Sequence, residues 1–134
     1  MNCRGFTLLE TLVAALLLAL AVTSALALTL RGFGATAEAR RAETAAALAA
    51  DFAGRARALA QVDWTALPAP LPCTACPPEQ VAAREFADWR VQVADTLPDG
   101  TAQLVTGPGD ALLLRIAWTE TGGQARELSV GIAR

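Results

Sequence analysis

A long uninterrupted hydrophobic segment near the N-terminus dominates the pattern of hydrophobic and polar positions. No charged side chain occurs from Thr11 to Leu30, and one carboxylate, Glu10, stands at the start of this segment. A helix that crosses a membrane needs about 20 predominantly apolar residues. The pattern therefore predicts a transmembrane helix over residues 6–31.

The helical pattern continues beyond the hydrophobic segment, into an amphipathic extension over residues 32–62. The first proline is Pro68, and the chain up to about Ala60 is rich in alanine and leucine, which favours one very long helix. Gly32 and Gly34 each lower helix stability by about 1 kcal/mol relative to alanine. Two interpretations fit this glycine pair: a break between two helices, or a flexible joint within one.

Hydrophobic and charged residues of the extension separate onto two faces, as in an amphipathic helix. The apolar face consists of Leu48, Phe52, Ala56 and Leu59. The charged residues expected to be solvated are Glu38, Arg40, Arg41 and Glu43. Helical spacing also predicts ion pairs of Glu38 with Arg41 and of Asp51 with Arg55, worth about 0.2–0.5 kcal/mol each. The apolar face requires a cover, which the C-terminal region can supply.

Residues 63–134 predict a small domain that begins with a proline-rich connector and a second helix. Trp64 is expected to pack beneath the connector. The helix should begin near Pro78, since proline is favoured in a first helical turn. Its hydrophobic positions recur every three or four residues and predict a buried stripe. The stripe consists of Ala82, Phe86, Trp89, Val93 and Leu97.

Three strand-like segments separated by glycine-containing turns complete this domain. They cover residues 101–106, 111–120 and 125–133. In the middle segment, hydrophobic residues alternate with others from Leu112 to Trp118, which is typical of a strand with one buried face. The expected fold class is therefore α+β: a long N-terminal transmembrane helix packed on a small domain with a second helix and a three-stranded antiparallel sheet.

The composition excludes several kinds of chemistry. The chain of 134 residues has no lysine, histidine or tyrosine, and all eleven basic residues are arginines. This excludes a phosphate-binding lysine, a Schiff base, Ser-His and Cys-His nucleophiles and histidine metal ligands. The net charge of −2 does not suit nucleic-acid binding. We expect neither enzyme activity nor a cofactor, a metal or a nucleic-acid partner.

Two of the three cysteines, Cys73 and Cys76, lie in the proline-rich connector, whereas Cys3 lies among the first five residues. A redox-active pair would need a βαβ context, and a zinc site would need four ligands. Disulfides persist outside the cytoplasm, so we expect a structural disulfide between Cys73 and Cys76. Because the closed loop is short, the disulfide should fix the shape of the loop more than global stability.

Three interpretations of the N-terminus are possible, and Glu10 helps to distinguish them. A lone carboxylate in a membrane-spanning segment costs roughly 2.5–3.5 kcal/mol of insertion free energy, so it needs an explanation. A secretory signal cleaved after Ala21 or Ala27 would have a hydrophobic core of about 7–15 residues, shorter than this one. A plain membrane anchor explains the length of the segment but not the acid. The third interpretation is a short basic leader over residues 1–5 that is cleaved off and leaves the helix on the mature protein.

The segment from Gly5 to Glu10 resembles the cleavage motif of the type IV prepilin family at every position. The resemblance implies that prepilin peptidase cleaves between Gly5 and Phe6 and methylates the new N-terminal amine of Phe6. It also implies that the helix packs into a filament core. There, the family glutamate, here Glu10, pairs with the N-terminal amine of a neighbouring subunit.

Individually weak motifs in the rest of the chain are similar to those of PilV-type minor pilins, also called type IV pilus modification proteins. They are Ala49-Ala50-Asp51, the paired cysteines, Ala87-Asp88-Trp89, Leu97-Pro98-Asp99-Gly100 and Trp118-Thr119. The resemblance implies a low-abundance subunit that is incorporated into a type IV pilus or primes its assembly. The implied partners are prepilin peptidase, other major and minor pilin subunits, the inner-membrane assembly platform and membrane lipid.

The implied location is the inner membrane, crossed once with the C-terminal domain outside the cytoplasm, and the pilus or cell surface after assembly. The alternative is a minor pseudopilin of a type II secretion system, which shares the processing and the helix. Some pseudopilins carry a calcium-binding loop, but the candidate acids here are too scattered for one and are expected in turns or in solvent. They are Asp95, Asp99, Asp110 and Glu120.

Overall fold

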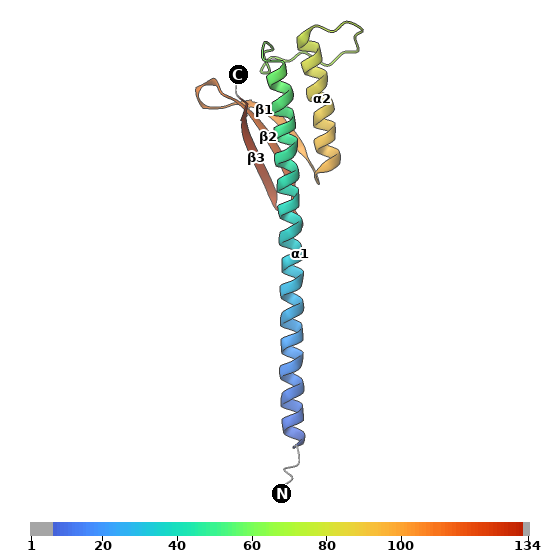
Figure 1. Cartoon of the computed structure of the whole chain (residues 1–134), viewed down its shortest axis with the longest axis vertical. Helices are drawn as coiled ribbons and strands as arrows, with labels where there is room; N and C mark the ends of the chain where they lie inside the picture. Colours follow the sequence, from blue (N-terminus) through green and yellow to red (C-terminus); the bar gives the residue numbers. More distant parts are fainter. Residues whose placement is uncertain (1–6, 133–134) are drawn as a thin grey trace. The chain divides into compact units, whose positions relative to one another are not determined.

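A computed structural model describes residues 7–132, apart from the side chain of Asp110. The described residues form two α-helices, three strands and a short 3-10 turn (Figure 1). In chain order these are α1 (Leu8–Ala58), α2 (Pro78–Thr96), β1 (Thr101–Thr106), η1 (Pro108–Asp110), β2 (Leu112–Thr119) and β3 (Ala125–Ile132). The predicted α+β fold class is confirmed, and the predicted helices and strands agree with the observed ones to within a few residues.

Helix α1 is continuous through Gly32 and Gly34, so the predicted alternative of a break between two helices is not observed. A Cβ atom added at either glycine would meet no atom within 4 Å. Packing therefore does not require glycine at these two positions. The chain divides into two compact units, residues 1–37 and residues 38–134, and the division falls shortly after this pair.

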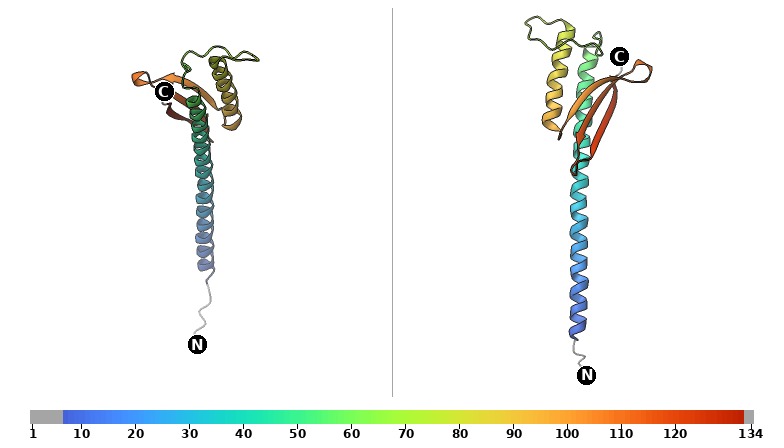
Figure 2. Two further views of the ribbon diagram at one scale, coloured as in Figure 1. Left: turned by 45° about the horizontal axis from the view of Figure 1, so that its top comes forward. Right: turned by 180° about the vertical axis from the view of Figure 1, so that it is seen from behind.

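In the second unit, β1, β2 and β3 form an antiparallel sheet in that order, and the unit also contains the C-terminal part of α1 and helix α2 (Figure 2). Leu114 of β2 is opposite Leu104 of β1 and Val130 of β3. Alternate residues of β2 are buried, as the sequence pattern predicts. Gly122 and Gly123 close the turn after β2 with φ of 101° and 80°, values that favour glycine.

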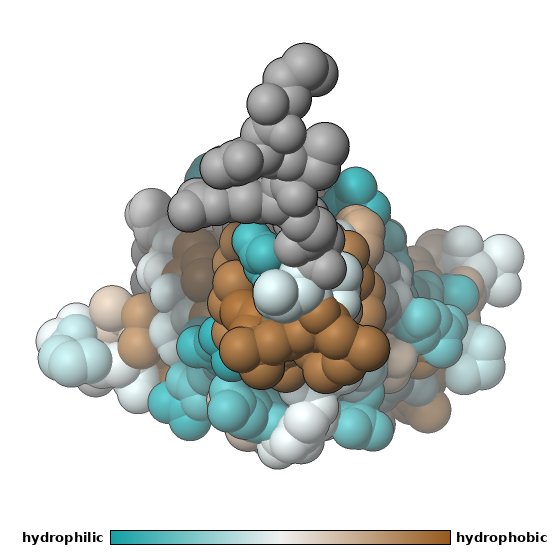
Figure 3. Space-filling view, turned by 90° about the horizontal axis from the view of Figure 1, so that it is seen from below, coloured by the Kyte–Doolittle hydropathy of each residue, from teal (hydrophilic) through white to brown (hydrophobic). Residues whose placement is uncertain are grey.

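The first unit is described for residues 7–37, and its large apolar side chains are exposed. Leu8, Leu16 and Leu28 expose 78%, 69% and 72% of their surface. Figure 3 shows that hydrophobic residues dominate the surface at the N-terminal end of this helix. Among the described residues, α1 is the one helix that is long and apolar enough to cross a membrane.

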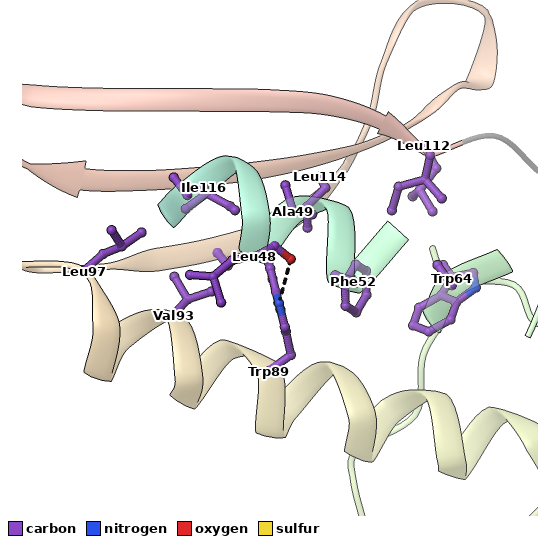
Figure 4. Close-up of a cluster of buried hydrophobic side chains, with 14 of the residues drawn as sticks. Leu48, Ala49, Phe52, Trp64, Trp89, Val93, Leu97, Leu112, Leu114 and Ile116 are labelled. Atoms are coloured by element: carbon purple, nitrogen blue, oxygen red, sulfur yellow. Dashed lines mark hydrogen bonds between the residues drawn. The ribbon is translucent and has the colours of Figure 1, made fainter. Parts of the chain in front are cut away.

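The core of the second unit forms where α1 lies between the sheet and α2 (Figure 4). Phe52 of α1 is fully buried, and its ring contacts the rings of Trp89 and Trp64 with centroid distances of 4.6 and 5.3 Å. The indole N–H of Trp89 donates a hydrogen bond of 3.1 Å to the carbonyl oxygen of Leu48. Both predicted apolar faces are therefore confirmed as core, with Leu59 and Phe86 partly buried at its margin.

Gly100 connects α2 to β1 and is required by packing. A Cβ atom at this position would lie 2.9 Å from the carbonyl oxygen of Leu97 and closer still to that of Val93. Both are backbone atoms, so Gly100→Ala should lower the free energy of unfolding by about 1–3 kcal/mol. Gly54→Ala is the matched control, because no atom lies within 4 Å of the new methyl group.

In the interior of α1, alanine at position 54 should instead raise helix stability by about 0.5–1 kcal/mol. Urea unfolding followed by circular dichroism, with the full chain in detergent micelles, measures both variants. Equal effects of the two substitutions would contradict the packing argument.

Candidate functional site

The first candidate site is the start of α1, where Glu10 lies exposed in the first helical turn. Its backbone N–H donates to the carbonyl oxygen of Thr7 at 3.0 Å and lies 3.4 Å from the hydroxyl oxygen of the same residue. A negative charge is favourable near a helix N-terminus. Within residues 7–132, the Glu10 carboxylate has neither a hydrogen-bond nor an ion-pair partner. Gly5 and Phe6, the predicted processing residues, lie outside the described residues.

The hydroxyl side chains of the hydrophobic segment all bond to the helix itself. Thr11, Thr23, Ser24 and Thr29 each donate to a carbonyl oxygen three or four residues earlier, at 2.7–3.0 Å. Such bonds satisfy polar groups inside the helix, as an apolar surrounding requires. Glu10 is therefore the one polar side chain between Leu8 and Leu30 that needs a partner from outside the helix.

The connector between α1 and α2 contains the disulfide between Cys73 and Cys76, whose Cα atoms are 5.4 Å apart. Both cysteines are partly exposed. The side chain of Gln80 joins this connector to α2, since its amide oxygen accepts from the N–H of Leu71 and its amide nitrogen donates to the carbonyl oxygen of Ala69. Trp64 is buried at the start of the connector, as predicted.

A buried charge that the sequence did not reveal lies at the end of β2. Glu120 is 4% exposed, and its two carboxylate oxygens accept from the indole N–H of Trp118 at 2.7 Å and from the guanidinium of Arg41 at 2.6 Å. Arg41 also donates to the hydroxyl of Thr121 at 3.1 Å. The predictions of a solvated Arg41 and a solvated Glu120 are therefore wrong. The alternative prediction of Glu120 in a turn holds, because its carbonyl oxygen accepts from the N–H of Gly123 at 2.9 Å in the β2–β3 turn. The contact of Arg41 with Glu120 joins α1 to the β2–β3 turn.

Of the two ion pairs predicted from helical spacing, the structure contains one and replaces the other. Arg55 pairs with Asp51 at 2.9 Å, as predicted, and also with Glu85 of α2 at 2.9 Å. Glu38 does not pair with Arg41, because Arg41 is directed to Glu120; Glu38 instead lies 3.6 Å from Arg126 of β3. Two of these pairs link α1 to elements far away in the sequence.

The Glu120 cluster gives a pH-dependent prediction. The hydrogen bond from Trp118, and next the hydrogen bond and charge of Arg41, hold the pKa of Glu120 below its ordinary value of 4.5, against the opposing effect of burial. A carboxylate with a lowered pKa in the folded state stabilises the fold above its unfolded pKa. This stabilisation is lost as the pH falls through the folded pKa.

Glu120→Gln should therefore lower the unfolding midpoint at pH 7, and the difference in midpoint from the wild type should shrink as the pH falls below 4.5. Thermal unfolding followed by circular dichroism, at pH 7 and at a series of pH values below 4.5, measures this difference. Glu127→Gln, at an exposed ion pair with Arg115, is the control and should have little effect. If the difference in unfolding midpoint between Glu120→Gln and the wild type stayed constant with pH, the predicted contribution of the Glu120 carboxylate would be wrong.

Within residues 7–132, the fold and the site combine one long apolar helix that fits membrane anchoring, a small α+β unit and a carboxylate without a partner in the first turn of that helix. The family model described as "Prokaryotic N-terminal methylation motif" matches residues 1–26. This match supports a type IV prepilin-like family and fits a type IV pilin or pseudopilin, a structural and not a catalytic class. Comparison with curated proteins and with solved structures gave no match.

Proposed function

We propose that the chain is a minor pilin, a subunit that is incorporated into a type IV pilus or primes its assembly. Prepilin peptidase removes residues 1–5 and methylates the amine of Phe6. Helix α1 anchors the subunit in the inner membrane, with residues 63–134 outside the cytoplasm. The assembly platform then transfers it into a filament of major and minor subunits.

The unpaired carboxylate of Glu10 carries this proposal. It lies in a segment whose other polar side chains bond to their own helix and whose large apolar side chains are exposed. An acid in lipid is costly and normally has a partner. The N-terminal amine of a neighbouring processed subunit supplies such a partner, because the two charges neutralise each other in a dry bundle.

Two features of the second unit fit this proposal: its disulfide bears on the compartment, and its core bears on which apolar surface is left to the membrane or to other subunits. The disulfide between Cys73 and Cys76 suits an oxidising compartment. The unit also buries its own apolar residues around Phe52 and Trp89, so it folds around a core of its own and leaves the exposed apolar helix surface to lipid or to other subunits.

Cleavage between Gly5 and Phe6 is tested by replacing Gly5 with leucine. A bulky side chain at this position should block the peptidase, so the full-length precursor should accumulate in the membrane fraction. Intact mass and N-terminal sequencing distinguish it from a mature protein that begins at methylated Phe6. Gly34→Leu is the matched control, since open space surrounds that glycine in α1, and this variant should mature normally.

Normal maturation of Gly5→Leu, or a wild-type chain that begins after Ala21 or Ala27, would contradict the proposal. The choice between a pilus and a type II secretion system depends on where the mature subunit is found. Its presence in sheared surface fibres supports the minor pilin. Co-purification with a secretin-linked secretion complex, without fibres, supports the minor pseudopilin instead.

A further inference from the structure

A groove runs between helix α2 and strand β1, within the second unit. Two adjoining cavities, each of about 350 Å³, form it and share Ala87 and Arg90 of α2 in their walls. One cavity extends toward Thr101 at the start of β1, and the other toward Leu104 and the proline-rich connector. We refer to both together as the α2–β1 groove.

One side of the groove is a strand edge without a partner. Strand β1 pairs with β2 on one side, and its backbone has no hydrogen bond on the other side to any of residues 7–132. Proteins usually protect such an edge with charges, prolines or bulges. Strand β1 has the sequence TAQLVT, with no charge and no proline, whereas the opposite edge strand β3 has Arg126 and Glu127. The β1 edge therefore has unpaired backbone groups and carries no protecting charge or proline.

A single positive charge in the α2–β1 groove indicates which kind of ligand can bind there. Arg90 is the one charged residue among the described residues that line it. Its guanidinium lies 5.9 Å from the centroid of the Phe86 ring and has no ion-pair partner within residues 7–132. Nearby Val91, also in the wall, exposes 60% of its surface. A cation held on an aromatic face beside small apolar side chains suits a carboxylate on a mainly apolar segment.

We propose that the α2–β1 groove binds an extended segment of a partner protein that carries an aspartate or glutamate. The segment adds to the sheet as a strand beside β1, so its main chain supplies the hydrogen bonds. Its side chains on one face contact Ala87 and Val91, and its carboxylate pairs with Arg90. Because the groove lies wholly within residues 38–134, this inference is independent of how the N-terminus is processed.

The test is a selection of displayed random eight-residue peptides on the full chain in lipid nanodiscs. It is run in parallel on Arg90→Gln and on Arg84→Gln, a control at an exposed arginine of α2 that lines neither cavity. Wild type and Arg84→Gln should enrich the same acidic peptides without central proline. The best peptide, made synthetically, should bind Arg90→Gln roughly 10-fold more weakly. It should also slow amide hydrogen exchange in β1 and not in β3.

Three outcomes would overturn the proposal. The first is no enrichment on the wild type above empty nanodiscs. The second is peptides that bind wild type and Arg90→Gln equally, or that lack an acid. The third is protection of β3 or α1 amides in place of β1, which would place the peptide elsewhere on the molecule. Circular dichroism of each variant shows whether it keeps the wild-type fold.

Discussion

Glu10→Ala should remain in the membrane but be depleted at least about 10-fold from assembled filaments. Removing the carboxylate makes α1 easier to insert, by at most the roughly 2.5–3.5 kcal/mol that a charge costs at the centre of a membrane-spanning helix, so anchoring should not suffer. What the variant loses is the charge that pairs with a neighbouring amine. The measurement is the ratio of the mature subunit in sheared fibres to that in membranes, by immunoblot.

Two further variants sharpen this test. Glu10→Gln keeps the size of the side chain and removes the charge, so it should behave like Glu10→Ala. Glu43→Ala removes an exposed acid of α1 in the second unit and should be incorporated normally. If Glu10→Ala reached fibres at the level of the wild type, Glu10 would have no role in assembly.

Trp89→Ala should destabilise the second unit by about 3–5 kcal/mol. Trp89 is 1% exposed, stacks near Phe86 and Phe52, and donates to the carbonyl oxygen of Leu48. Its removal leaves a cavity where α2 meets α1. Because small domains have about 5–15 kcal/mol of stability in total, much of the population should unfold under mild denaturant.

Urea unfolding in micelles followed by circular dichroism gives the magnitude. Trp89→Phe keeps an aromatic ring and loses the N–H, so it should cost less than Trp89→Ala. Val91→Ala is the control on the same helix, because that side chain is 60% exposed, and it should change stability by no more than about 0.5 kcal/mol. A small effect of Trp89→Ala would mean that α2 contributes little to the unit.

The fold was predictable where local periodicity carries the information. The spacing of Leu48, Phe52 and Ala56, and the stripe through Trp89 and Val93, place apolar residues on one side of each helix, and these positions are buried. The alternation along β2 worked for the same reason. Neither pattern states which faces meet, since that depends on contacts between residues far apart in the sequence.

Glu120 shows where the prediction failed, although a signal was present. Burial alternates along β2 through Leu112, Leu114, Ile116 and Trp118, and Glu120 is the next position of the same alternation. A charged residue normally marks the end of such a pattern. Here it stays buried because Trp118 and Arg41 supply donors, and Arg41 comes from 79 residues earlier in the chain.

The same contact explains the wrong prediction for Glu38. The rule of helical spacing compares only neighbours on one helix, and its energy is a few tenths of a kcal/mol. A buried carboxylate with unfilled acceptors competes more strongly for Arg41 than an exposed glutamate does. The candidate site at Glu10 was found by its isolation, whereas the processing of Gly5 and Phe6 remains a prediction for the experiments above.

The positions of the tryptophans make intrinsic fluorescence a probe of one part of the protein. Trp64, Trp89 and Trp118 are the three tryptophans of a chain without tyrosine, and all are at least nine-tenths buried in the second unit. Intrinsic fluorescence therefore reports on that unit alone. A red-shifted emission signals that its core has opened to water, whereas an unchanged spectrum on transfer from detergent to a fibre shows that the core has stayed closed.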